Sequence, residues 1–174
     1  GLYPARPPYY TGRHRFAKHY YGVIGDLQEA GARQTDHEYH CAVALDNLSQ
    51  VRHWVRNLAR FPEFSFWLPT ASDRFYPDFV AELEDGRLLV VEYKGEGYKS
   101  ADDAIEKRRV GELWARLSGN LFLLAVERDA QGRCVAEQLR ACVGSVAIAE
   151  HARVVALVDI AFDGGVVPAG SLGT

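Results

Sequence analysis

The chain has 174 residues, of which 48% are hydrophobic and 25% are charged, and this composition suits one domain with a proper core rather than a disordered segment. Its formal net charge of -3 excludes a uniformly basic protein, so any basic surface must be local. No apolar run approaches the length of a membrane span, and three cysteines without metal-ligand spacing indicate free thiols of a reducing, cytoplasmic compartment. Methionine is absent, so we expect the sequence to be part of something larger.

Residues 1–35 are expected to be a connector from an upstream domain, because Pro4, Pro7 and Pro8 favour an extended backbone. Basic residues, Arg13 among them, are interleaved with aromatic residues, and residues 1–20 contain no acid. Two interpretations are open. Either the segment grips a nucleic-acid strand through phosphate contacts and stacking, with Arg13 as a candidate contact, or its tyrosines dock it on the core or on the upstream domain.

A helix is predicted from Asp36, which can cap its N-terminus, to about residue 48. In residues 51–58 the arginines fall on one side of a two-residue alternation, which predicts a strand with one basic edge. Residues 64–69 predict another short strand. Arg56 on the first of these strands is a candidate for phosphate binding, although solvated charge on an edge strand is the commoner explanation.

A β-hairpin is predicted over residues 75–83 and 88–94, which are rich in β-branched and aromatic residues. Glu84-Asp85-Gly86 between the two runs is a turn signal. Residues 88–91 are apolar on both faces, so we expect the second strand to lie at the centre of the sheet.

The loop of this hairpin decides which side chains face one another. A three-residue loop with Gly86 in the left-handed region places Asp78 opposite Glu92, on the face that Lys94 shares. A two-residue loop would instead place Asp78 opposite Tyr93 and separate the charged group.

The two carboxylates of Asp78 and Glu92 need a partner if they converge. Two carboxylates about 4 Å apart repel by roughly 4 kcal/mol at an effective dielectric constant of about 20. A divalent cation removes this repulsion, and magnesium is held by one or two carboxylates together with water and phosphate oxygens. Lys94 would then orient or deprotonate the attacking water and offset developing charge. The alternative is an ordinary surface hairpin with scattered charges.

After the hairpin, a helix is predicted to about residue 117, and Lys107 lies off its apolar stripe, near the charged group. Residues 121–126 predict a buried strand, and residues 134–143 predict a short amphipathic helix. Residues 144–174 are unassigned, and they are either an extra hairpin that covers a sheet edge or non-native sequence joined at a fragment end. The predicted stripe consists of Val110, Leu113, Trp114 and Leu117.

Pro77-Asp78 followed by Glu92-Tyr93-Lys94 resembles the signature of the PD-(D/E)xK nuclease superfamily. The flanking residues 76–83, 90–96 and 106–115 look like the C-terminal endonuclease domain of type III restriction enzyme Res subunits and related helicase-type restriction proteins. This similarity extends from about residue 3 to about residue 143.

The resemblance implies an α/β fold with a restriction-endonuclease-like αβββαβ core, in which helices flank a central mixed sheet over residues 36–143. It implies a magnesium-dependent deoxyribonuclease, the cleavage module of a restriction-type helicase-nuclease, in which manganese can substitute for magnesium. Asp78, Glu92 and the Tyr93 carbonyl would hold the metal, and Lys94 would act on the water. Glu38 matches a helix glutamate that reaches the metal in many such nucleases, and its alternative is an exposed first-turn acid.

The same resemblance implies partners and further substrate contacts. Lys107 would contact the substrate, which is DNA, and the upstream part would be a helicase or ATPase domain or subunit, with a methyltransferase or specificity subunit as a further partner. Two rival functions remain open, a catalytically silent nucleic-acid-binding module of the same fold and a nuclease that acts on RNA. Target sequence, cleavage pattern and oligomeric state are not encoded in any motif of the chain.

Overall fold

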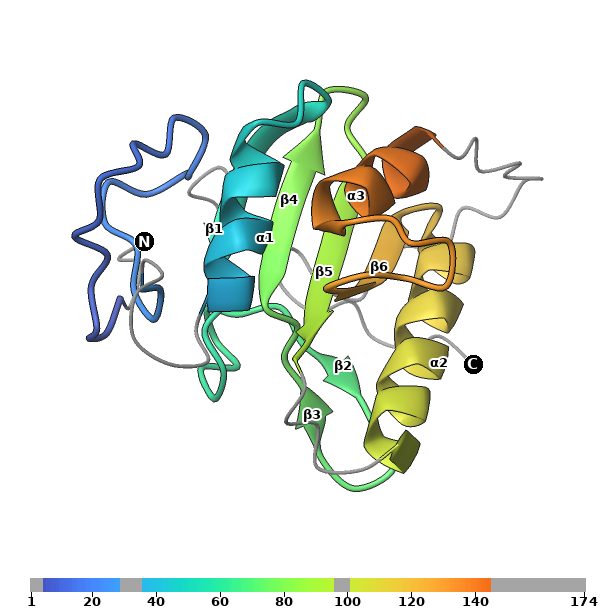
Figure 1. Ribbon diagram of the computed structural model, residues 1–174. Helices are drawn as coiled ribbons and strands as arrows, with labels where there is room; N and C mark the ends of the chain where they lie inside the picture. Colours follow the sequence, from blue (N-terminus) through green and yellow to red (C-terminus); the bar gives the residue numbers. More distant parts are fainter. Residues whose placement is uncertain (1–4, 29–35, 96–100, 145–174) are drawn as a thin grey trace.

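The computed structural model describes residues 5–28, 36–95 and 101–144, which form an α/β domain around a four-stranded sheet (Figure 1). The strand order is β1-β4-β5-β6, and the sheet is mixed because β5 pairs with β4 in antiparallel and with β6 in parallel orientation. Helices α1 and α3 cover one face, and α2 covers the other. The helices are α1 (Asp36–Asp46), α2 (Ala101–Ser118) and α3 (Val135–Gly144), and the strands of the sheet are β1 (Val51–Arg56), β4 (Phe79–Leu83), β5 (Leu88–Lys94) and β6 (Leu121–Val126).

The hairpin between β4 and β5 has the register that brings the acidic residues together. Gly86 has a φ of 83°, and the Leu83 amide donates to the Arg87 carbonyl, which closes a three-residue loop. Phe79 consequently pairs with Val91, which places Asp78 beside Glu92 at the end of the ladder. The prediction of a three-residue loop is confirmed.

Strand β5 is central, as its apolar pattern predicts. Its interior residues from Leu89 to Tyr93 are all buried, and they alternate between two cores. Leu89, Val91 and Tyr93 face α1 and α3, whereas Val90 faces α2. A charged side chain at the end of this strand is therefore attached to a strand whose interior is buried on both faces.

The predicted strand over residues 75–83 is interrupted in the structure. Arg74–Phe75 forms β3 and pairs with Leu68–Pro69, which forms β2, in a separate two-stranded sheet. Pro77 has no N–H to give to a ladder, and its carbonyl instead accepts a hydrogen bond of 2.7 Å from the buried amide of Asn57. The interruption frees Asp78 from the strand just before β4 begins.

Helix α2 packs part of the predicted stripe, Val110 and Trp114, against the core. Leu113 and Leu117 are 45% and 46% exposed, so they do not contribute to the core. Gly111 faces the sheet instead, and a Cβ atom there would lie 2.5 Å from the Phe122 ring. A glycine on this face lets the helix approach β6 closely. The stripe prediction is confirmed for Val110 and Trp114 and was wrong for Leu113 and Leu117.

The N-terminal segment packs along the outer side of β1. His19 forms a parallel bridge with Trp54, and Tyr10 and Phe16 pack against the core under α1. This packing agrees with the docking interpretation for those two rings. Arg13 is exposed, so its predicted phosphate contact stays a prediction.

Other sequence predictions agree with the structure or fall outside it. Helix α3 and strand β6 appear where they were predicted, with boundaries shifted by at most one residue. The strands considered within residues 144–174 lie beyond the described part, apart from residue 144 itself at the end of α3. None of the helices in the described ranges combines the length and the apolar character that a membrane span requires.

Candidate functional site

The candidate site lies where β5 ends and β4 begins, close to the N-terminal end of α1. The Asp78 carboxylate accepts a hydrogen bond of 2.8 Å from the Tyr93 amide, which fixes it against the backbone of the neighbouring strand. Glu92 precedes Tyr93 and is 5% exposed. The register places Asp78 opposite Glu92 in the hairpin, but different partners hold the two carboxylates: Arg56 and the Tyr93 amide hold Asp78, and Lys107 holds Glu92.

Arg56 on β1 binds two of the site's acids at once. Its Nη1 donates to Asp78 Oδ1 at 2.8 Å, and its Nη2 donates to Glu38 Oε2 at 2.6 Å. The guanidinium also donates to the backbone carbonyls of Asp78 and Asp26, and it lies over the Phe79 ring. Arg56 is only 6% exposed, so it acts in the structure as an internal counter-charge rather than as part of a basic edge.

Glu38 joins the site from the first turn of α1, and its proton is held unusually tightly. Burial raises the pKa of Glu38 to about 7, and this effect outweighs the lowering by Arg56, while Asp78 and Asp26 raise the pKa further. A carboxyl group with a pKa near neutrality can take up and release a proton at working pH.

Lys107 on α2 is the cation on the opposite face of the sheet. Its Nζ lies 3.1 Å from Glu92 Oε1 and 3.5 Å from Asp103 Oδ2, and it stands over the Phe75 ring. Burial alone lowers the pKa of Lys107, but the two acids raise it above its ordinary value. The prediction that Lys107 lies near the site is confirmed, and its contact in the structure is the candidate metal ligand Glu92.

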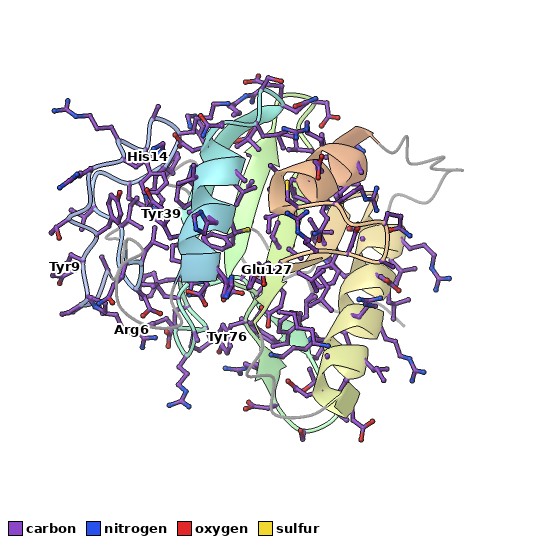
Figure 2. The ribbon with its side chains drawn as sticks, in the orientation of Figure 1. Arg6, Tyr9, His14, Tyr39, Tyr76 and Glu127 are labelled. Atoms are coloured by element: carbon purple, nitrogen blue, oxygen red, sulfur yellow. The ribbon has the colours of Figure 1, made fainter. Side chains whose placement is uncertain are left out.

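Lys94 stands at the open end of β5. It is partly exposed and lines a hollow of about 460 Å³ together with Gly95, Val126, Glu127 and Arg128. Figure 2 labels Glu127, which follows the end of β6 and lines this hollow, and Tyr76, which lies in the loop before Asp78. A substrate that enters this hollow reaches Lys94 directly.

The donors at the site suit a magnesium ion. Among the described residues no group of three His, Cys, Asp or Glu side chains gathers at one point, so a cage made of protein side chains alone is not formed there. Magnesium does not need one, because it binds through one or two carboxylates and completes its shell with water and phosphate oxygens. Asp78 and Glu92 supply hard oxygen atoms from adjacent strands, which fits that requirement.

The structure joins the predicted residues in two groups. Glu38, Arg56 and Asp78 are linked by ion pairs, with the Tyr93 amide bound to Asp78, and Lys107 pairs with Glu92. Lys94 lines the hollow at the end of β5, and Arg13 lies in the N-terminal segment. The sequence reasoning missed the pairing of Arg56 with both acids and the stacking of the His37 ring on Tyr93, at 5.3 Å between centroids. The available signal for Arg56 was the alternation of side chains along the strand, which places it on the same side as Trp54.

Comparisons of the chain with protein-family models, curated proteins and solved structures find no match.

Proposed function

We propose that this domain is a magnesium-dependent deoxyribonuclease that hydrolyses DNA phosphodiester bonds as the cleavage module of a restriction-type helicase-nuclease. The observation that carries the proposal is the pair of carboxylates, Asp78 and Glu92, at the ends of adjacent strands, with Lys94 two residues further along β5. The PD-(D/E)xK signature formed by the same residues supports it.

In this proposal each residue has a defined task. Asp78, Glu92 and the Tyr93 carbonyl hold magnesium, which when bound polarises the phosphate and acidifies a water molecule. Lys94 places a positive charge beside the phosphate and offsets the negative charge that develops on its oxygens. Lys94 also orients or deprotonates the attacking water. Glu38, which Arg56 bridges to Asp78, assists the metal site from α1.

The proposed partners follow from the same activity. DNA is the substrate, an upstream helicase or ATPase part delivers it, and a methyltransferase or specificity subunit selects the target. Phosphate contacts position DNA without reading its sequence, so target choice is assigned to the partners.

One observation favours a second candidate function, a nucleic-acid-binding module of this fold without catalysis. Arg56 and Lys107 neutralise Asp78, Glu38 and Glu92 within the domain, so the acids are already paired. In such a module the same ion pairs would serve to hold the elements together.

The test is cleavage of supercoiled plasmid by the purified chain with magnesium, with EDTA, and as the Lys94→Ala variant. Cleavage that requires magnesium and falls by about 10² to 10³ in Lys94→Ala supports the nuclease, since losses of this size follow removal of one charge-stabilising group. Arg116→Ala is the matched control, because Arg116 is exposed in the last turn of α2. Circular dichroism establishes that all variants are folded.

Several outcomes would decide against the nuclease. Equal cleavage by wild type and Lys94→Ala would show that the activity comes from elsewhere. DNA binding without cleavage, even after the helicase part is restored, would favour the silent module. Preferential cutting of an RNA oligonucleotide over the matched DNA would reassign the substrate.

A further inference from the structure

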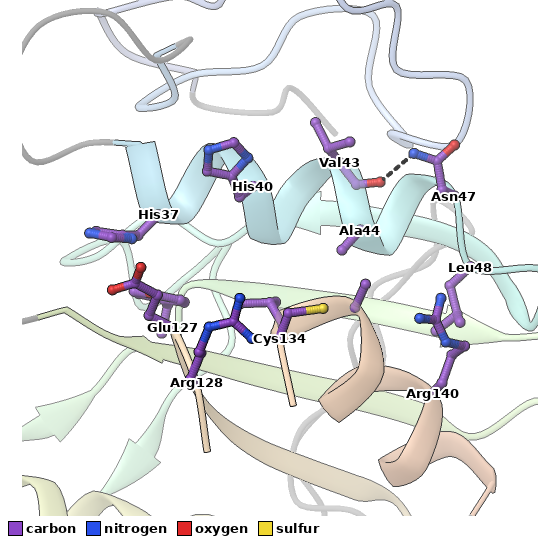
Figure 3. Close-up of a pocket in the computed structure, with 13 residues that line it drawn as sticks. His37, His40, Val43, Ala44, Asn47, Leu48, Glu127, Arg128, Cys134 and Arg140 are labelled. Atoms are coloured by element: carbon purple, nitrogen blue, oxygen red, sulfur yellow. Dashed lines mark hydrogen bonds between the residues drawn. The ribbon is translucent and has the colours of Figure 1, made fainter. Parts of the chain in front are cut away.

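A second hollow opens between α1 and the start of α3, on the other side of β5 from α2 (Figure 3). Its volume is about 580 Å³, within the range of about 300 to 1,000 Å³ that is usual for small-ligand pockets. Val43, Ala44 and Leu48 from α1 and the segment after it, together with Val135 from α3, form an apolar floor. A flat apolar group of the size of a nucleobase can lie on such a floor.

The rim of this hollow, which we call the α1/α3 hollow, is basic. His37 and His40 stand on the α1 side, and Arg128 and Arg140 stand on the opposite side (Figure 3). The Arg128 guanidinium donates to the Gly132 carbonyl at 3.0 Å, which holds it at the rim. Glu127 is the single acid among the lining residues, all of which belong to the described part of the chain. A ligand that combines an apolar ring with a negative charge matches this distribution.

The α1/α3 hollow also connects to the candidate active site. Glu127 and Arg128 line both this hollow and the smaller one that contains Lys94. Tyr93, which follows Glu92, forms part of the wall, and its ring stacks on His37 with an angle of 9° between planes. A chain of nucleotides that passes Lys94 therefore meets Arg128 and then the apolar floor.

We propose that the α1/α3 hollow binds a single nucleotide of the DNA strand next to the cleaved phosphodiester, with its base on the apolar floor and its phosphate between Arg128 and Arg140. The identity of the ligand as a DNA strand rests on the proposed function. Stacking surfaces and arginine side chains together are the usual means of holding single-stranded DNA. An unpaired nucleotide held here would fix the strand relative to Lys94 and so position the bond to be cut.

The experiment measures binding of a fluorescein-labelled single-stranded DNA oligonucleotide to the full chain by anisotropy, in EDTA so that no cleavage occurs. We expect Arg128→Ala/Arg140→Ala to weaken binding at least about 10-fold and to reduce the slope of log affinity against log salt by about 0.7, since the two arginines neutralise one phosphate and each phosphate of a single strand adds about 0.7. Ala44→Phe fills the hollow and should weaken binding by about 5- to 100-fold without changing the salt slope, because it removes the base contact alone.

Two control variants distinguish nucleotide binding in the α1/α3 hollow from the proposed nuclease activity. Arg116→Ala removes an exposed arginine outside the hollow and should leave affinity within about 2-fold, in line with the small effect of a single distant charge. Asp78→Asn should abolish cleavage and retain binding. If the Arg128→Ala/Arg140→Ala and Ala44→Phe proteins are folded by circular dichroism and bind DNA with unchanged affinity, the proposal that the α1/α3 hollow binds a nucleotide is wrong, even if plasmid cleavage is intact. If those variants lose binding while the wild-type protein never cleaves DNA, the proposal of nucleotide binding in the α1/α3 hollow is supported and the proposed nuclease activity is rejected.

Discussion

At the scale of single residues, the acidic side chains of the site form ion pairs with basic residues on the two faces of the sheet. Arg56 joins Glu38 to Asp78 on one face, and Lys107 holds Glu92 on the other. Removal of Arg56, which is 6% exposed, would leave Asp78 without its counter-charge and should cost about 3 to 5 kcal/mol, whereas Arg56 keeps Asp78 as a partner when Glu38 is replaced. These pairs therefore constrain which residues the site can lose without unfolding.

Glu38 should make stability depend on pH near neutrality. Its pKa is about 7 in the folded state against 4.5 in the unfolded chain, so the folded state binds more protons in that window. The free energy of unfolding of the wild type should consequently fall as pH rises from about 4.5 to about 7. Glu38→Gln removes this effect, and we expect it to be more stable than wild type by about 1 kcal/mol above neutrality, a value reduced for solvent screening.

Urea unfolding of both proteins across this pH range measures the difference. The two curves should coincide at about pH 4.5 and diverge as pH rises. Glu63→Gln, a change of an exposed acid, should follow the wild type at every pH. A constant difference between Glu38→Gln and wild type would show that the proton of Glu38 is not involved.

At the scale of elements, the close approach of α2 to β6 sets the position of Lys107. Gly111 is buried, and a Cβ atom would lie 2.5 Å from three atoms of the Phe122 ring. Gly111→Ala should therefore push the helix outward and destabilise the fold by about 1 to 3 kcal/mol. In the double variant with Phe122→Leu the smaller side chain leaves room for the methyl group, so the two changes should cost less together than their sum.

Thermal and urea unfolding of the two single variants and the double variant give this coupling. Ala115→Gly is the control for helix propensity. At an ordinary helix position glycine is about 1 kcal/mol less stable than alanine, so a loss of stability in Gly111→Ala would come from the steric clash with Phe122 and not from helix propensity. A stabilising effect of Gly111→Ala would contradict the predicted clash.

The same elements show what could be read from the sequence. Strand β5, the loop at Gly86 and strand β6 follow from local signals, namely continuous apolar runs and a turn glycine, and the structure confirms them. The orientation of α2 depends on the fit of Gly111 against Phe122, a contact between residues distant in the chain. The pairing of Arg56 with two acids from other elements is likewise tertiary, and hydrophobic periodicity carries no information on it.

At the scale of the whole domain, the exposed side of β1 is covered by the N-terminal segment rather than left as a free edge. A free edge strand invites pairing with other chains. Here the Tyr20 amide donates to the Trp54 carbonyl, and the Trp54 amide donates to the Lys18 carbonyl, so β1 is hydrogen-bonded on both sides. The segment thereby covers the edge of the sheet that carries the site.

Asp46 at the end of α1 is the residue that holds this segment in place. Its carboxylate accepts hydrogen bonds from the amides of Ala17 and Lys18 and from the Trp54 indole, at 2.8 to 2.9 Å. Asp46→Ala leaves these donors without their acceptor and should destabilise the domain by about 3 to 5 kcal/mol, since each buried donor costs about 1 to 3 kcal/mol when unpaired.

Trypsin digestion and urea unfolding separate local from global effects of Asp46→Ala. Arg13 and Arg15 are exposed cleavage sites just before the anchored residues. If Asp46 is the anchor, cleavage at these sites should accelerate in Asp46→Ala under conditions where the remainder of the domain resists digestion, because local opening precedes global unfolding. Glu63→Ala should leave both digestion and the urea midpoint unchanged. Equal digestion of Asp46→Ala and wild type would mean that the packing of Tyr10 and Phe16 alone keeps the segment on the domain.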